Sequence, residues 1–206
     1  MKTWFITGAS RGFGALIMEA ALASGDAVVA TARDPSSIAD HPRLLKLPLD
    51  VTSEGQARDA AAKGIEKFGA VDVLVNNAGY GLLGAVEESS AVEVERVFAT
   101  NVFGLLNVTR AVLPYMRKRR SGHIVNMSSV GGYAANYPGW GVYCATKFAV
   151  EGISEALSVE LAPLGIYATV VEPGFFRTDF LSAQSLSSTA ARIDDYEDTE
   201  IGRAHV

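Results

Sequence analysis

Residues 7–14 read TGASRGFG and directly follow the short apolar run WFIT at residues 4–7. The three glycines, Gly8, Gly12 and Gly14, stand where a strand gives way to a segment of helical periodicity. Glycine lets the backbone turn sharply and approach a ligand closely, and a helix start offers unpaired N–H groups and a positive dipole end. The stretch predicts a phosphate-binding turn after the first strand, the alternative being a glycine-rich turn with no ligand. Its spacing, Gly-x3-Gly-x-Gly, differs from the commoner G-x-G-x-x-G.

Strand and helix patterns alternate along the chain on both sides of this turn, through residue 173. The predicted strands are Trp4–Thr7, Ala27–Thr31, Leu44–Leu49, Val71–Asn76, His123–Met127 and Ile166–Glu172. The predicted helices are Gly12–Ser24, Ser53–Phe68, Ala91–Arg119 and Tyr143–Leu164. Near-continuous apolar strands suit a sheet covered on both faces, so the fold class is α/β, a doubly wound (Rossmann) parallel sheet in a single domain.

Composition divides this domain into two parts. Residues 1–181 carry the strand–helix alternation and are expected to form the dinucleotide-binding and catalytic part. Residues 182–206 are rich in Ser, Ala, Asp and Glu and are expected to form a polar lid or tail. Such a segment is either a mobile surface stretch or a lid over the site, and both can hold at once.

Charge and composition narrow the classes of partner. The chain has 206 residues, a net charge of -5 and 49% hydrophobic residues, which fits a globular protein and argues against nucleic acid as a partner. The basic run Arg117–Arg120 follows a helical pattern and is interpreted as a solvated helix end. Cys144 is the single cysteine and His41, His123 and His205 lie far apart, so no metal site is expected. The N-terminal apolar run is too short for a signal peptide or membrane span, which makes the cytoplasm the expected location.

The end of the second predicted strand bears on cofactor choice. An acid there would bond the ribose 2′-hydroxyl of NAD and repel a 2′-phosphate, and neither Thr31 nor Ala32 is acidic. Arg33 and Arg11 are placed to bind a phosphate, although Asp34 follows at once. NADP(H) is therefore favoured, with NAD(H) possible.

Tyr143 and Lys147 are the candidate catalytic pair. Residues i and i+4 share a helix face, so an ammonium could bring the phenol pKa toward the working range. The alternative is a surface helix with a buried tyrosine. Ser128 and Ser129 end the fifth predicted strand, where ligands of such sheets bind, and Asn101 inside the long helix could bond a backbone carbonyl and a water.

Together these residues resemble the short-chain dehydrogenase/reductase family in its compact, single-domain form, over about residues 3–180. The resemblance rests on these motifs: Thr7–Gly14, Asp50, Asn77-Ala78-Gly79, Asn101, Ser128-Ser129, Tyr143 with Lys147, and Pro173-Gly174 with Thr178.

The resemblance implies a strand order of 3-2-1-4-5-6 and a small-molecule carbonyl or alcohol substrate. It implies a catalytic tetrad of Asn101, Ser129, Tyr143 and Lys147, with Tyr143 as general acid/base. It also implies a homodimer or homotetramer, because many members pair the two long helices. The expected cofactor-binding residues are Gly8, Ser10, Arg11, Gly12, Phe13, Gly14, Arg33, Asp50, Val51, Asn77, Ala78, Gly79, Tyr143, Lys147, Pro173, Gly174 and Thr178.

The chain departs from the family pattern in two places. Ser129 precedes Tyr143 by one residue more than is usual, so Ser128 stays the fallback for the catalytic serine. The family continues into a further helix and a seventh strand, whereas this sequence stops at Val206. We therefore expect the sequence to be incomplete, the alternative being a protein that lacks one sheet edge and part of its pocket wall.

Loop aromatics suggest the nature of the substrate. Tyr133, Trp140, Phe175 and Phe176 are expected to line the pocket, which favours an apolar or aromatic carbonyl or secondary alcohol; the alternative is that several pack under the lid. The leading hypothesis is an NADP-dependent oxidoreductase that transfers hydride to or from such a substrate. The alternatives are a non-catalytic NADP(H)-binding sensor or scaffold and an isomerase or epimerase using the same Tyr/Lys pair.

Overall fold

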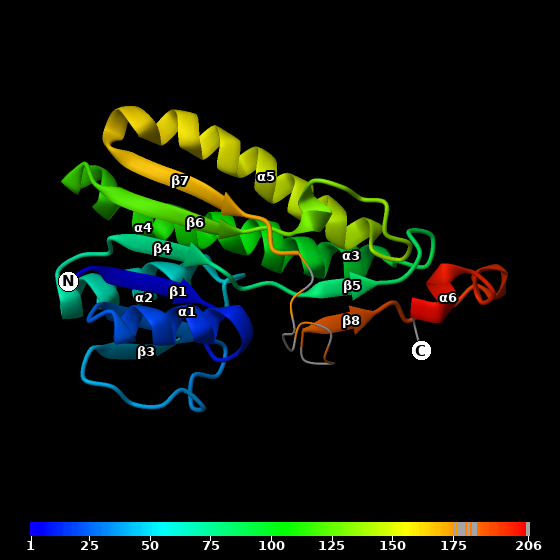
Figure 1. The fold of residues 1–206 in the computed structure, drawn as a ribbon, viewed down its shortest axis with the longest axis horizontal. Helices are drawn as coiled ribbons and strands as arrows, with labels where there is room; N and C mark the ends of the chain where they lie inside the picture. The colour runs from blue at the N-terminus through cyan, green and yellow to red at the C-terminus, as the bar shows by residue number, and fades with distance from the viewer. Residues whose placement is uncertain (175, 177–179, 181, 183–184, 205–206) are drawn as a thin grey trace.

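Six parallel strands form the main sheet of the computed structural model, in the order β3-β2-β1-β4-β6-β7 (Figure 1). The structure describes residues 1–174, 176, 180, 182 and 185–204, without the side chains of 203 and 204. The strands are β1 (Thr3–Thr7), β2 (Ala27–Ala32), β3 (Leu44–Pro48), β4 (Val73–Asn76), β6 (Gly122–Met127) and β7 (Ile166–Val171). This confirms the predicted fold class and the order 3-2-1-4-5-6, because β5 lies outside the main sheet.

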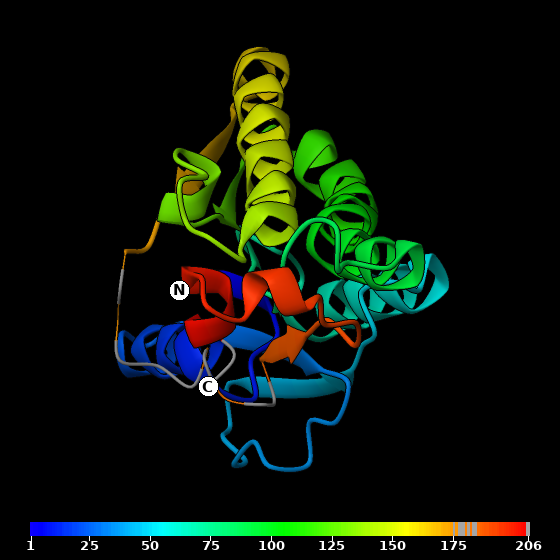
Figure 2. The ribbon, with the colours of Figure 1, turned by 90° about the vertical axis from the view of Figure 1, so that its right-hand side faces the viewer.

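Helices cover both faces of the sheet. They are α1 (Gly12–Ala23), α2 (Glu54–Phe68), α3 (Ala91–Phe98), α4 (Leu105–Arg119), α5 (Gly141–Leu161) and the short α6 (Glu200–Ala204). Single turns form η2 (Val130–Gly132), η3 (Ala162–Leu164) and η5 (Asp194–Tyr196). Figure 2 shows α4 and α5 on one side of the sheet and α1 on the other.

The core explains why the strands are almost wholly apolar. Neighbouring residues of a strand point to opposite faces, and here both faces are covered. Phe5 packs with side chains of α2, α4 and α5, whereas Ile6 packs with Met18 and Ala21 of α1. Phe5 and Ile6 are both fully buried, so β1 is the centre of the domain and fixes where its last residue, Thr7, presents the glycine turn.

A second, two-stranded parallel sheet joins β5 (Gly81–Leu83) to β8 (Leu186–Ser188). Gly81 pairs with Leu186 and Leu83 pairs with Ser188. Figure 1 shows these strands side by side beyond the carboxyl ends of the main strands, with α6 further out. Part of the segment predicted as a lid or tail is therefore a strand packed at the end of the sheet where ligands of such folds bind.

The predicted helix Ala91–Arg119 is one continuous helical run with a change of winding in the middle. Ser90 and Glu93 form a capping box at its start, and a π-helical segment, η1 (Ala99–Gly104), separates α3 from α4. By length and composition alone the run could cross a membrane, yet 56% of its most apolar window is buried within the protein, as in a core helix.

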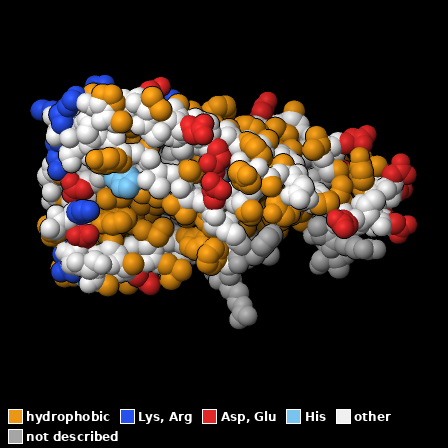
Figure 3. Space-filling view, turned by 45° about the horizontal axis from the view of Figure 1, so that its top comes forward, with side chains coloured by type: hydrophobic (Ala, Val, Ile, Leu, Met, Phe, Trp, Pro, Cys, Tyr) orange, Lys and Arg blue, Asp and Glu red, His pale blue; other side chains and the backbone are white. Residues whose placement is uncertain are grey.

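The basic run forms the end of α4. Arg117, Lys118 and Arg119 lie in its last turn, where cations favour the helix dipole, and Arg119 pairs with Asp72 at 2.8 Å. Figure 3 shows Lys and Arg gathered at this end of the molecule, whereas Asp and Glu are spread along its length. The structure therefore gives this run the role of a solvated helix terminus.

Candidate active site

The glycine turn between β1 and α1 is shaped by three close constraints. Gly8 and Gly12 have φ angles of +64° and +55°, which favour glycine. A Cβ on Gly14 would lie 2.2 Å from the carbonyl oxygen of Gly8, so no larger residue fits there. A Cβ on Gly12 would meet nothing within 4 Å, so the turn is open on the side where its helix begins.

The start of α1 differs from the starts of α2 and α3. Ser53 caps α2 and Ser90 caps α3, whereas α1 has no side-chain cap at Arg11 and no acid in its first turn. Its first backbone N–H groups and positive dipole end are therefore available to an anion. The turn fits the pyrophosphate of a dinucleotide, with the backbone of Gly12, Phe13 and Gly14 as the donors.

Asn77 and Thr7 lock this turn to the end of β4. The Asn77 side-chain amide donates to the carbonyl oxygens of Thr7 and Gly8 at 2.9 and 3.1 Å. The Thr7 hydroxyl accepts from the backbone N–H groups of Asn77 and Ala78, both at 3.0 Å. The Asn77 side-chain nitrogen therefore holds the glycine turn, and the expected contact of Asn77 with the cofactor stays a prediction. Thr7 likewise ties the glycine turn to the end of β4, a role that its position as the last residue of a strand did not reveal.

The residues expected at the adenine end of the cofactor lie at the carboxyl ends of β2 and β3. Arg33 is exposed just after β2, and Asp34 accepts from the backbone of Ser36 at 2.9 Å. Hydrogen bonds from Ser36 lower the Asp34 pKa, so this carboxylate is charged and held at its own turn. Arg11 donates from Nε to the Ser185 hydroxyl at 3.2 Å, which joins the glycine turn to the segment before β8.

Asp50 and Val51 follow β3. The Asp50 carboxylate accepts from the backbone and hydroxyl of Thr52 at 3.0 and 2.7 Å. The Val51 side chain is buried, and a Cβ on Gly104 would lie only 2.5 Å from it, so this side chain packs in the core. Of the pair expected to hold the adenine, Asp50 is therefore the one with an accessible side chain.

Tyr143 and Lys147 lie one turn apart near the start of α5, and both are 7% exposed. The Lys147 ammonium donates to the carbonyl oxygen of Met127 at 2.8 Å and lies 5.7 Å from the centre of the Tyr143 ring. The strand end of β6 thus positions the lysine next to the tyrosine, as their spacing on one helix face predicts.

Burial dominates the electrostatics of this pair. Desolvation raises the pKa of Tyr143 to about 12, while a hydrogen bond with Ser129 acts in the opposite direction. Desolvation lowers the pKa of Lys147 to about 8, opposed by the Glu151 carboxylate. The expectation that Lys147 brings the Tyr143 pKa down toward neutrality is wrong for the protein alone, because the cost of removing the phenolate from water outweighs the hydrogen bond with Ser129 that favours it.

The two serines after β6 face different partners. Ser129 accepts from the backbone of Gly131 at 3.1 Å and hydrogen-bonds with Tyr143. Ser128 is 5% exposed, and its hydroxyl lies with Glu151 Oε1 around the point where a Cβ of Gly132 would stand. The geometry therefore pairs Ser129, and not Ser128, with the candidate catalytic tyrosine.

Asn101 lies in the π-helical segment η1 and is 2% exposed. Its side-chain amide donates to the Tyr80 carbonyl oxygen at 2.9 Å and to the Thr146 hydroxyl at 3.1 Å, while its oxygen accepts from the Tyr80 N–H at 3.0 Å. Its oxygen also lies 3.1 Å from where a Cβ of Gly79 would stand. π-Helical turns concentrate at functional sites. In this protein the π-helical segment η1 brings Asn101 to Thr146 of α5. The expected contact of Asn101 with a backbone carbonyl oxygen is present, at Tyr80.

Aromatic rings gather beside Tyr143. The Trp140 ring lies 5.5 Å from the Tyr143 ring and 6.4 Å from the Phe180 ring, and Phe180 lies 5.6 Å from Tyr143. Tyr133 follows η2 and is 80% exposed, which gives no support to its expected place in the pocket wall.

The remaining expected residues lie around the turn after β7. Phe176 is 64% exposed and meets the Phe13 ring edge-on at 5.5 Å, beside the glycine turn and away from the Trp140 cluster. The Pro173 carbonyl oxygen accepts from Val130 at 3.1 Å, and Gly174 is exposed. Phe175 and Thr178 lie outside the described residues.

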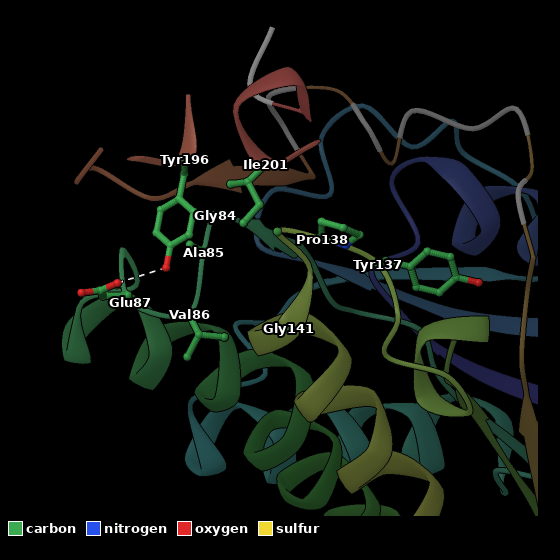
Figure 4. Close-up of a pocket in the computed structure, with 10 residues that line it drawn as sticks. Gly84, Ala85, Val86, Glu87, Tyr137, Pro138, Gly141, Tyr196 and Ile201 are labelled. Carbon is green, nitrogen blue, oxygen red and sulfur yellow. Dashed lines mark hydrogen bonds between the residues drawn. The ribbon is translucent and has the colours of Figure 1, made fainter. Parts of the chain in front are cut away.

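A pocket of about 510 Å³ lies next to this site and does not include Tyr143 (Figure 4). It is enclosed by the segment after β5, the loop before α5, and the η5–α6 segment. Tyr196 donates to Glu87 across it at 3.0 Å, and the Tyr137 ring points away from this pair. Trp140, whose ring lies 5.5 Å from the Tyr143 ring, falls in the sequence between Gly139 and Gly141 of the pocket wall. Within the described part of the chain, no group of three or more His, Cys, Asp or Glu side chains could hold a metal ion.

Comparison with known proteins agrees with this geometry. The short chain dehydrogenase family matches residues 2–188. Oxidoreductase BOA17 of Botryotinia fuckeliana is 44% identical over 185 residues, covering 87% of this chain and 67% of its own. The 3-ketodihydrosphingosine reductase of Bacteroides thetaiotaomicron is 43% identical over 194 residues, covering 94% of this chain and 71% of its own.

Solved structures show the same likeness. A short-chain dehydrogenase from Streptomyces avermitilis superposes with a TM-score of 0.91 and 42% identity, covering all of this chain and 78% of its own. ElxO with NADP bound has a TM-score of 0.82 and 30% identity, over 91% of this chain and 86% of its own. A 3-ketoacyl-(acyl-carrier-protein) reductase from Brucella melitensis complexed with NADH has a TM-score of 0.85 and 30% identity, over 90% and 79%. The chain belongs to the short-chain dehydrogenase/reductase family.

Proposed function

We propose that this protein transfers a hydride between NADP(H) and a carbonyl or secondary alcohol, with Tyr143 as the general acid/base. The observation that carries the proposal is the assembly around Tyr143. Three polar side chains, Ser129, Lys147 and Asn101, converge there from β6, α5 and η1, next to an uncapped helix start that fits a pyrophosphate.

Each residue has a role that its contacts support. NADP(H) supplies or accepts the hydride at the substrate carbon. Tyr143 donates its proton to the carbonyl oxygen in reduction and takes it back in oxidation, and Ser129 holds that same oxygen by a hydrogen bond. Burial keeps Tyr143 protonated in the protein alone, with a pKa of about 12, which is the form that donates. Lys147 stabilises negative charge that develops on the phenol, and Asn101 holds Tyr80 and α5 in place.

The choice of NADP(H) over NAD(H) rests on charge at the end of β2. Arg33 is exposed there, no acid stands at Thr31 or Ala32, and Asp34 is engaged by Ser36. A guanidinium can form charge-assisted hydrogen bonds with a 2′-phosphate. Related structures contain NADP in one protein and NADH in another, so the preference is a property we assign to this chain from its own residues.

The substrate is proposed to be apolar or aromatic near its reacting carbon. Trp140 and Phe180 lie against Tyr143 and offer an apolar surface to such a group. One relative is named a 3-ketodihydrosphingosine reductase, a name that describes reduction of a ketone by that protein.

We further propose that residues 1–181 form the cofactor and catalytic part and that 182–206 pack over its open end as a lid, consistent with the β5–β8 pairing. Exposed Phe103, Phe148 and Val159 on the π segment and α5 fit an association of two or four copies through these helices. Light scattering of the purified protein would test this, with a monomer at micromolar concentration as the contrary result. A cytoplasmic location remains a prediction.

Titration with NADPH and NADH, followed by turnover on a panel of aldehydes, ketones and alcohols, tests the proposed function. We expect tighter binding of NADPH and net cofactor consumption with apolar carbonyls. Binding without consumption across the panel would favour the sensor or scaffold hypothesis. Conversion without net consumption would favour an isomerase or epimerase, and failure to bind either cofactor would contradict all three.

A further inference from the structure

Two buried polar atoms face the same small space beneath η2. In the part of the chain that the structure describes, the Ser128 hydroxyl and Glu151 Oε1 are among the few buried side-chain atoms with no hydrogen-bond partner. A Cβ placed on Gly132 would lie 2.5 Å from that hydroxyl and 2.9 Å from Oε1. Both atoms therefore converge on the side of Gly132 where a larger residue would separate them.

The chemistry of the two groups is complementary. A serine hydroxyl can rotate and donate, and an ionised carboxylate only accepts. The Ser128 backbone is held, because its N–H donates to the Val171 carbonyl oxygen at 2.8 Å, so a hydrogen bond between the two groups requires a side chain, and not the strand end, to turn. Buried polar groups in folded proteins nearly always find a partner, and these two unpartnered atoms both lie within 3 Å of the same point beside Gly132.

Glu151 also stands one helical turn after Lys147 on α5, as Lys147 stands one turn after Tyr143. Lys147 is 7% exposed and donates to the neutral Met127 carbonyl oxygen. Burial opposes its positive charge, and the Glu151 carboxylate favours that charge. The other titratable groups facing this region are Tyr143 and Cys144 on α5. The Tyr143 ring centre lies 5.7 Å from the Lys147 ammonium, and the Cys144 sulfur lies 3.0 Å from where a Cβ of Gly131 would stand.

We propose that Glu151 is a positioning residue, whose carboxylate accepts a hydrogen bond from Ser128 and keeps the Lys147 ammonium charged behind the catalytic tyrosine. Ser128 thus anchors the end of β6 to α5, while its neighbour Ser129 faces the substrate side. The mechanistic meaning of this role rests on the proposed function, but the Ser128–Glu151–Lys147 arrangement does not.

The test measures the Lys147 pKa directly, by NMR of protein labelled at the lysine ε-carbon, without substrate or cofactor. Lys147→Arg assigns the resonance. Glu151→Gln keeps the shape and removes the charge, and we expect the Lys147 pKa to fall by about half a unit or more. Glu155→Gln, an exposed carboxylate on the same helix, is the matched control and should leave it unchanged. Equal pKa values in the two variants would overturn the proposal.

Gly132→Ala provides a second, independent variant. Its Cβ would enter the space between Ser128 and Glu151 while every charge is retained. We expect the Lys147 pKa to fall here too, and an unchanged value would count against the proposal even if Glu151→Gln did not fold. If the Lys147 pKa fell in the variants but the wild-type protein showed no turnover, only the proposed function would be contradicted. If the wild-type protein turned over substrate but the Lys147 pKa did not change in the variants, only the role of Glu151 would be contradicted.

Discussion

Replacing Gly14 by alanine tests whether the glycine turn is as tightly built as the structure shows. The new Cβ would lie 2.2 Å from the Gly8 carbonyl oxygen and 2.6 Å from the Asn77 amide nitrogen. Neither atom can yield cheaply, because one is backbone and the other donates to Thr7 and Gly8. Space can come only from displacing the turn, which breaks both of these hydrogen bonds.

The expected magnitude follows from three opposing contributions. Alanine gains up to about 1 kcal/mol over glycine inside a helix. Overpacking costs about 1–3 kcal/mol, and each of the two lost hydrogen bonds costs about 0.5–1.5 kcal/mol. The Gly14→Ala protein should therefore be less stable by about 1–5 kcal/mol, and the displaced turn should weaken NADPH binding about tenfold or more.

Urea unfolding and NADPH titration measure the two effects. Gly152→Ala is the matched control, because it lies within α5 and a Cβ there would meet nothing within 4 Å. It should raise stability by about 0.5–1 kcal/mol and leave cofactor binding unchanged. If Gly14→Ala matched Gly152→Ala in both measurements, the reasoning about the turn would be refuted.

Three further predictions concern the cofactor, the pocket and pH. Arg33→Ala should weaken NADPH binding about tenfold and leave NADH binding unchanged, which parallel titrations would show; equal losses for both would contradict the assignment. Trp140→Ala should raise KM for the best carbonyl of the panel without changing NADPH affinity, whereas Tyr133→Ala, on an exposed residue, should change neither. Burial lowers the pKa of His123 below 6.5, so the unfolded chain takes up its proton first. The free energy of unfolding should fall as pH decreases from 6.5 through the folded pKa of His123. Urea unfolding of His123→Gln at several pH values should show a smaller fall over this range.

The strand order was expected from the family resemblance, whereas the sequence alone was sufficient for a parallel sheet covered on both faces, because its strands are short and almost wholly apolar. Phe5 and Ile6 show why: adjacent residues of β1 are both fully buried, on opposite faces. β5 and β8 could not be predicted in this way. Each has three residues, and their pairing joins Gly81 to Leu186, more than a hundred positions away, with no periodicity to mark it.

The candidate site was predictable in its residue types and less so in its contacts. Residues i and i+4 on a helix must share a face, so Tyr143 and Lys147 come together as expected. The choice of Ser129 over Ser128 depends on which way each side chain points after β6, which spacing alone does not determine. The π-helical turn at Asn101 depends on tertiary contacts with Tyr80 and Thr146 and leaves no mark in the local pattern.

Asn77 is a second residue whose contacts could not be predicted from the sequence. Its position after β4 suggested a ligand contact, but the structure uses its amide to hold the carbonyl oxygens of Thr7 and Gly8. The Tyr143 pKa was likewise expected to fall beside an ammonium, and burial raises it to about 12. The degree of desolvation is a property of the packed fold, so it could not be derived from the spacing of two residues.

The most direct test of the proposed chemistry compares wild type with Tyr143→Phe in NADPH consumption, using the best carbonyl substrate of the panel. The substitution removes only the phenolic hydroxyl, and NADPH affinity measured alongside should stay the same. Loss of the proton donor should lower kcat by about 10²–10⁴-fold. Undiminished turnover by Tyr143→Phe, with cofactor binding intact, would contradict the assignment of Tyr143 as the general acid/base.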